Sequence, residues 1–221
     1  MSRILLTPLI ILSLSFSARA QFNKGSILLG GQLSYTYNSY SDVNPTNPFN
    51  NDQKTNTANF YISIGKAITE NTVFGINLNY SPYSVSNYSY GIYSPLKYSN
   101  NSFGIGIYYR KYKNLGKDFF LFGEANALYI GSSQSGKDST GKEVLSGTGS
   151  GGSINLFPGI SYKISKKFFV EITIPDLFNV RYNSTKITSQ PEVDKSDQFN
   201  ITTSLSSNPL TDMAIGFRLD L

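Results

Sequence analysis

The chain has neither cysteine nor histidine among its 221 residues, and these two absences remove whole classes of chemistry. Without cysteine there is no disulfide scaffold, no thiolate metal site and no residue to carry a lipoprotein anchor. Without histidine the commonest general base and the commonest side-chain metal ligand are missing. We therefore expect no catalytic residues, no metal, no cofactor, and a protein that is not an enzyme. A serine–lysine site or a site built on carboxylates alone stays open, but no motif marks one.

Charged residues are few: 19 Lys and Arg residues stand against 14 Asp and Glu residues, which leaves a formal net charge of +5. This mild excess reflects a shortage of acids rather than a basic patch, whereas nucleic-acid binding requires positive charge concentrated on one surface. We therefore expect no nucleic-acid partner.

Long apolar runs are also absent, with one exception at the N-terminus. Arg3 precedes an apolar stretch at residues 4–16, and residues 18–20 form the Ala-x-Ala motif of a cleavage site. This order of features is typical of a secretory signal peptide. A membrane-spanning helix needs roughly 17–25 apolar residues, and this stretch is too short and is interrupted by Pro8. The sequence predicts a signal peptide at residues 1–20.

Residues 21–221 have the length of one domain and repeat one pattern from end to end. Each repeat is a stretch of about ten residues in which apolar residues alternate with polar or small ones, as in the strands of a membrane barrel. No part of this region is apolar enough for a membrane helix, so a closed β-barrel is the only spanning structure open to it. The eight predicted strands are residues 26–38, 58–67, 72–81, 102–112, 119–131, 153–163, 168–180 and 199–221, the last interrupted around Pro209.

The connections between these strands alternate strictly between long and short. The short ones are residues 68–71, 113–118 and 164–167; the long ones are residues 39–57, 82–101, 132–152 and 181–198. In an up-and-down barrel this places every long loop at one end, and both termini with the tight turns at the other. Outer-membrane barrels have this layout, with short periplasmic turns and long extracellular loops. The sequence therefore predicts an all-β protein, a single eight-stranded antiparallel up-and-down transmembrane β-barrel.

The two faces of each predicted strand differ in polarity. One face is apolar and carries no charge in mid-strand, whereas the other carries Gly, Ser, Asn and every mid-strand charge. An arginine facing lipid at mid-bilayer costs about 2–4 kcal/mol, and an eight-stranded interior is only just wide enough for its own side chains. We therefore expect the apolar face to point outward. On that face Pro158 cannot donate to the strand ladder, and it predicts a β-bulge.

Four charged residues have the inward parity: Arg110, Glu124, Glu171 and Arg218. Arg110 and Glu124 flank the same tight turn, within diagonal reach across the ladder, where opposite charges attract. Glu171 and Arg218, on the last two predicted strands, are expected to form a second pair. The inward set also includes the bulky Tyr108, Phe122 and Phe157. We expect a structural network that plugs the lumen; a proton or ion path is the alternative.

Several segments resemble the strands of small OmpA/OmpX-like outer-membrane barrels, above all the type abundant in Bacteroidota. They are residues 64–75, 103–112, 119–125, 158–162 and 169–171. Such barrels usually end in an alternating apolar strand that closes on an aromatic residue and is recognised by the insertion machinery. The resemblance assigns this role to Phe217, Leu219 and Leu221, with one departure, since the last residue is leucine.

The expected location is the bacterial outer membrane, with the long loops extracellular and both termini periplasmic. The expected partners are outer-membrane lipid, lipopolysaccharide and, during insertion, the barrel-assembly machinery. The resemblance implies a structural, adhesive or surface-interaction role, because small barrels serve as adhesins, surface shields, anchors and scaffolds. A narrow channel and a secreted lipocalin-like barrel that binds an apolar ligand are the alternatives. The sequence does not identify an extracellular partner.

Overall fold

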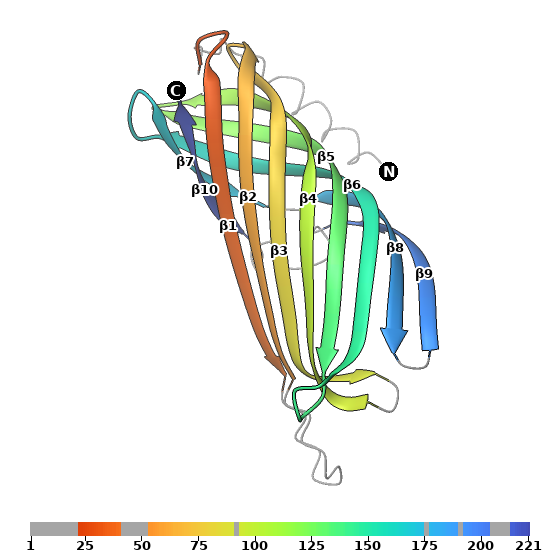
Figure 1. The fold of residues 1–221 in the computed structure, drawn as a ribbon. Helices are drawn as coiled ribbons and strands as arrows, with labels where there is room; N and C mark the ends of the chain where they lie inside the picture. Colours follow the sequence, from red (N-terminus) through yellow and green to blue (C-terminus); the bar gives the residue numbers. More distant parts are fainter. Residues whose placement is uncertain (1–21, 41–52, 91–92, 175–176, 190–191, 204–212) are drawn as a thin grey trace, which may run out of the picture.

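A computed structural model describes residues 22–40, 53–90, 93–174, 177–189, 192–203 and 213–221, which form one antiparallel sheet (Figure 1). Its strands are β1 (Ile27–Tyr40), β2 (Gln53–Thr69), β3 (Thr72–Tyr90), β4 (Tyr93–Gly116), β5 (Phe119–Lys137), β6 (Glu143–Lys163), β7 (Phe168–Thr173), β8 (Phe178–Ser189), β9 (Glu192–Thr202) and β10 (Ala214–Asp220). In these ranges no helix is long and apolar enough to cross a membrane. The predicted signal peptide, residues 1–20, lies outside the described residues.

The sheet closes on itself at the end that carries the tight turns. Consecutive strands pair from β1 to β7, β7 pairs with β10, and β10 pairs with β1, so these eight strands form a ring. The β8–β9 hairpin lies outside this ring and continues the sheet beyond β6 (Figure 1). Because of this ring, every strand at the tight-turn end has a neighbour on each side. Its backbone N–H and C=O groups can then all be paired, which the apolar interior of a bilayer requires.

The predicted number of eight strands is wrong, because the described residues form ten. The predicted strand at 168–180 divides into β7 and β8, and the predicted strand at 199–221 divides into β9 and β10. The sequence carries a proline in each of the two gaps, Pro175 and Pro209, and proline cannot continue a hydrogen-bonded ladder.

The predicted long connections are mostly strand in the structure. β3 and β4 leave only residues 91–92 between them, and the tip between β5 and β6 is residues 138–142. These segments are rich in Asn and Ser, but the hydrogen bonds of a β-ladder join backbone groups. Polar side chains therefore do not prevent the strands from continuing. The three tight turns are confirmed. Most of the first long connection, residues 41–52, lies outside the described residues.

The bulge predicted at Pro158 is absent, because β6 pairs with β5 without a register shift at Pro158, which lies opposite Gly123. On its other edge β6 pairs with β8 over residues 146–156 and with β7 over residues 159–163. The Pro158 carbonyl accepts the backbone N–H of Ile174 at 3.1 Å, on this second edge. The N–H and C=O of one strand residue point to the same neighbour. The backbone N–H that proline lacks would therefore point to the edge of β6 where its neighbour changes from β8 to β7, so no ladder bond is lost there.

The apolar face of the ring points outward, as predicted. Ile62, Ile105 and Ile215 on this face are at least half exposed, whereas the predicted inward side chains Tyr108, Phe122 and Phe157 are buried. A soluble lipocalin-like barrel would instead turn this face inward, away from water. The lumen at the tight-turn end holds a cluster of ten buried residues, largely aromatic. Phe22 belongs to it, with its ring centroid 5.2 Å from that of Tyr112.

Candidate functional site in the lumen

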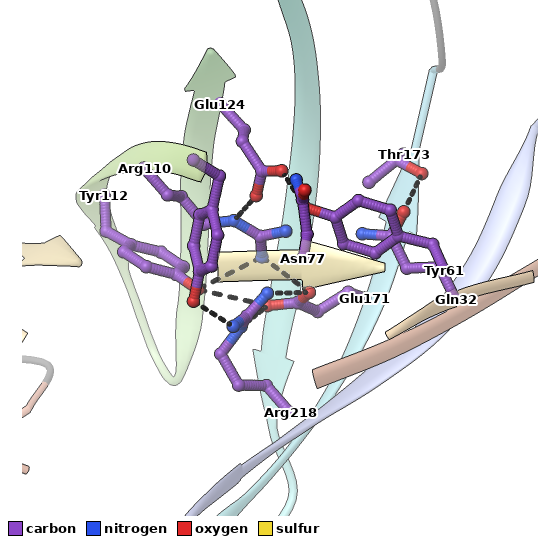
Figure 2. A network of polar contacts seen from close by, with 10 residues as sticks. Gln32, Tyr61, Asn77, Arg110, Tyr112, Glu124, Glu171, Thr173 and Arg218 are labelled. Carbon is purple, nitrogen blue, oxygen red and sulfur yellow. Dashed lines mark hydrogen bonds and ion pairs between the residues drawn. The ribbon is translucent and has the colours of Figure 1, made fainter. Parts of the chain in front are cut away.

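The four inward charged residues form one connected chain rather than two separate pairs (Figure 2). Arg110 Nε lies 2.5 Å from Glu124 Oε2, and Arg110 Nη1 lies 2.6 Å from Glu171 Oε2. Arg218 Nε lies 3.1 Å from Glu171 Oε1. All four side chains are buried. Two arginines and two glutamates balance one another, so the chain of ion pairs is neutral.

Strand register accounts for only part of this arrangement. Arg110 lies directly opposite Glu124 on the β4–β5 ladder, not diagonal to it as predicted. Glu171 lies opposite Gly216, so Arg218 is its diagonal neighbour on β10. The contact between Arg110 and Glu171 joins β4 to β7, which are not adjacent in the sheet. It crosses the lumen and therefore exists only because the barrel is closed.

Two tyrosines that we did not predict as site residues complete the network. Tyr61 Oη donates to Glu124 Oε1 at 2.5 Å and accepts from Asn77 Nδ2 at 2.9 Å. Tyr112 Oη donates to Glu171 Oε1 at 3.2 Å. The sequence carried a signal for both, because each has the inward parity: Tyr61 lies between the outward residues Phe60 and Ile62, and Tyr112 follows Arg110 by two positions.

Small and aromatic residues make room for the two guanidinium groups. The Arg110 guanidinium carbon lies 4.1 Å from the centroid of the Phe122 ring, within cation–π distance. Arg218 lies against Gly30, where a Cβ atom would come within 2.9 Å of Arg218 Nη2. Gly159 gives the Phe122 ring similar space, since a Cβ there would overlap it. A larger residue at Gly30 would displace the end of the Arg218 side chain, and one at Gly159 would displace the Phe122 ring.

The half of the lumen away from the tight turns is hollow. A cavity of about 550 Å³ is bounded by residues of β1, β2, β3, β5, β6, β9 and β10, and Tyr61 belongs both to its lining and to the network. None of the described residues that line it is Asp, Glu, Lys or Arg. A second cavity of about 170 Å³ shares four lining residues with it and adds one cation, Arg181; the shared residues are Asn59, Asn79, Leu128 and Asn155. We call the larger cavity the outer chamber.

The remaining predicted site residues lie on the outer wall. Phe217 and Leu221 are 40% and 63% exposed at the end of the chain, and Leu219 pairs with Leu29 of β1. Phe217 covers Gly31, where a Cβ would lie 2.8 Å from its ring. Within the described ranges, no three acidic residues gather in a way that would hold a metal ion.

Comparisons with known proteins agree with this architecture. The family model of the outer membrane protein beta-barrel domain matches residues 5–206. No curated protein shows a significant sequence match. The outer membrane protein OprG from Pseudomonas aeruginosa superposes with a TM-score of 0.50 at 12% identity, over 92% of this chain and 99% of that chain.

Two further solved structures are more distant. The N-terminal barrel of Pseudomonas aeruginosa OprF has a TM-score of 0.44 at 10% identity, over 90% of this chain and 100% of that chain. The outer membrane protease OmpT from Escherichia coli also has a TM-score of 0.44 at 10% identity, over 89% of this chain and 94% of that chain. At such identities a likeness concerns the fold alone. The family match, the two-faced strands and the closed ring make this chain a member of the outer membrane protein beta-barrel domain family.

Proposed function

We propose that this outer-membrane barrel has a structural and surface-interaction role, and that side chains close its lumen at the tight-turn end. The observation that carries the proposal is the neutral chain of ion pairs from Glu124 to Arg218, stacked on the aromatic cluster that contains Phe22. At this end the ring has eight strands, and an interior of that size has room for little more than such side chains. We assign no catalytic activity, because the chain has no histidine and carries no recognisable nucleophile–base motif.

The charge balance favours a plug over an ion path. Each carboxylate is held by at least one guanidinium at 3.1 Å or less, and a tyrosine hydroxyl donates to each. Every charge in the network faces at least one opposite charge, although Arg110 Nη2 has no hydrogen-bond partner among the described residues. Breaking one pair would leave a buried charge at a cost of several kcal/mol. The narrow channel stays as the competing function.

We propose further that the tight-turn end faces the periplasm and the outer chamber faces the exterior. Support comes from the chain ends, because Phe22 N bonds Glu70 O in the β2–β3 turn and Leu221 N bonds Ile27 O. Both described ends thus lie with the tight turns, in the layout typical of outer-membrane barrels. Lipid and lipopolysaccharide would contact the apolar wall, and the assembly machinery would recognise the row of Phe217, Leu219 and Leu221.

Conductance of the purified protein in planar bilayers tests this function. We expect no steady conductance of porin size from the wild type, because the network and the aromatic cluster block the path. Heat-modifiable migration on SDS gels checks that the same preparation is a folded barrel, since a closed barrel has its backbone bonds paired. Large, stable, open channels from a folded preparation would refute the plug and establish the channel.

A further inference from the structure

The outer chamber has the dimensions of a ligand site rather than of a packing defect. Its volume of about 550 Å³ lies within the range of roughly 300–1,000 Å³ typical of small-molecule sites. Strands from most of the ring contribute to its wall, and the buried network forms its floor at Tyr61. It is therefore a recess whose floor is the network. Beside it, β1 pairs with β10 only from Leu28 to Leu33, and the one strand that pairs with β9 in the described sheet is β8.

Most of the described side chains in the wall are polar and uncharged. Side-chain amides and hydroxyls predominate, represented by Gln32, Asn59, Asn126, Thr55 and Thr57, and the described lining carries no formal charge. Amides offer both donors and acceptors, and hydroxyls offer the same pair of functions. Such a wall matches a ligand whose own groups are neutral donors and acceptors, whereas an ionic ligand in an enclosed site needs a counter-charge.

Neighbouring side chains hold several of these amides in place before any ligand arrives. Asn59 Nδ2 donates to Ser34 Oγ at 3.1 Å, and Asn59 Oδ1 accepts from Ser81 Oγ at 2.6 Å. Asn155 Nδ2 donates to Asn126 Oδ1 at 2.6 Å. Groups held in position lose little freedom on binding, which favours affinity.

One donor in the wall is buried and has no protein acceptor. Gln32 Nε2 makes no hydrogen bond within the described part of the chain, although Gln32 Oε1 accepts from Thr173 Oγ1 at 3.5 Å. A buried unpaired donor costs free energy. Gln32 Nε2 has almost no accessible surface, so an acceptor on a ligand would reach it only if this side chain turned toward the chamber. The aromatic residues in the described lining of the chamber are Tyr61, Tyr83 and Phe157, and of these Tyr61 and Phe157 are largely buried.

We infer that the outer chamber binds a neutral polyhydroxylated ligand, an uncharged oligosaccharide segment. Sugar hydroxyls pair with amides and hydroxyls, and the apolar C–H face of a sugar ring packs on an aromatic face. The inference rests on the proposed function in one respect, the proposed orientation, which makes the chamber accessible to a ligand from outside the cell. Binding to the purified barrel tests the chamber by itself, whereas bilayer conductance tests the plug.

The test is saturation-transfer NMR and titration calorimetry on the folded, detergent-purified full chain. The probes are two neutral trisaccharides, maltotriose and triacetylchitotriose, with trigalacturonic acid as the acidic comparison. We expect at least one neutral trisaccharide to bind and the acidic one to bind more weakly. Thr57→Tyr places a ring inside the chamber and should weaken binding by about tenfold or more. Asn59→Leu, which removes an oriented amide, should also weaken binding.

Ala58→Tyr is the matched control, because it adds the same ring to the same strand on the outward face, opposite Tyr35. It should bind as the wild type does, and heat-modifiable migration verifies that each variant is folded. Absence of binding by both neutral probes, tighter binding of the acidic probe, or unchanged binding in Thr57→Tyr and Asn59→Leu would each overturn the inference. None of these outcomes affects the conductance test of the plug.

Discussion

At the scale of single residues, Glu171 is the centre of the lumen network. It accepts from Arg110, Arg218 and Tyr112, whereas Glu124 accepts from Arg110 and Tyr61. Loss of Glu124 leaves Arg110 with Glu171 as a second carboxylate partner. Loss of Glu171 leaves Arg218 with no carboxylate partner among the described residues. The two glutamates therefore differ in how much of the network depends on them.

We predict that Glu171→Gln destabilises the barrel more than Glu124→Gln does. The first change leaves a buried guanidinium unmatched and should cost about 3–5 kcal/mol, with a smaller loss for the second. The temperature at which the folded band converts to the unfolded band in SDS measures the difference. Glu143→Gln, at the exposed start of β6, is the control and should leave this temperature unchanged. Equal effects of Glu171→Gln and Glu143→Gln would contradict a structural network.

A second prediction concerns the tip of the β5–β6 hairpin. Asp138 Oδ1 accepts from Thr140 Oγ1 at 2.6 Å and from the backbone N–H groups of Thr140 and Lys142 at 2.9 and 3.0 Å. These bonds, the Thr140 hydroxyl first, hold the pKa of Asp138 below its usual 3.8. Because the folded pKa is depressed, the stabilisation is present above the unfolded pKa and is lost as pH falls through the folded one.

We expect Thr140→Ala to raise the pKa of Asp138 toward 3.8, because it removes the largest of these contributions. Ser139→Ala is the control and should leave the pKa where it is in the wild type. The measurement is an NMR titration of the Asp138 carboxyl group. A wild-type pKa at or above 3.8 would show that the hydroxyl bond is not formed in solution.

At the scale of elements, the tight turn between β4 and β5 is built from strained residues. Lys117 and Asp118 have φ values of 47° and 68°, and Gly116 and Phe119 pair across them. Two consecutive positive φ angles are typical of a type I′ hairpin turn, which favours Asn-Gly. The sequence places Lys and Asp at these positions, so the turn adopts this geometry at a cost.

Replacing this pair with the favoured one should stabilise the barrel. We predict that Lys117→Asn with Asp118→Gly raises stability by about 0.5–1 kcal/mol, because left-handed backbone costs an ordinary residue roughly 1–2 kcal/mol. Urea titration of the folded barrel in lipid vesicles measures the gain. Asn71→Gly, in the β2–β3 turn outside the described positive-φ positions, should instead be neutral or destabilising. A gain of the same size from both variants would argue against relief of turn strain.

The closing strand β10 carries a second prediction at this scale. β10 pairs with both β1 and β7, so its removal opens the ring and leaves unpaired backbone groups facing lipid. Deletion of residues 213–221 should therefore abolish membrane insertion, as measured by fractionation and heat-modifiable migration. Normal membrane levels of the truncated chain would contradict the role that we propose for Phe217, Leu219 and Leu221.

At the scale of the whole molecule, the two ends of the barrel are built differently. One end carries the tight turns, both described chain ends and the packed aromatic cluster, and the other carries the outer chamber and the β8–β9 hairpin. This polarity predicts the orientation in the membrane. An epitope inserted at Gly141, in the β5–β6 tip, should be labelled by antibody on intact cells. An epitope at Lys166, in the β6–β7 turn, should be labelled only after the outer membrane is permeabilised; the reverse pattern would invert the topology.

Sequence reasoning worked best where the cause is local. Successive side chains of an extended strand point to opposite faces, so the inward parity of Arg110, Glu124, Glu171 and Arg218 could be read from neighbours in the chain. The tight turns followed from breaks in the alternation. Tyr61 and Tyr112 had the same parity and were missed because tyrosine suits either face of a barrel wall.

What the sequence by itself determined is therefore the two-faced wall, the tight-turn end and the set of residues that point into the lumen. Only the tertiary structure decided that β6 exchanges β7 for β8 beside Pro158, because partner choice depends on strands distant in the chain. It also decided that Arg110 meets Glu171 across the lumen, joining two expected pairs into one network. The outer chamber was likewise decided by the tertiary structure, because residues from seven strands line it and no single strand predicts it.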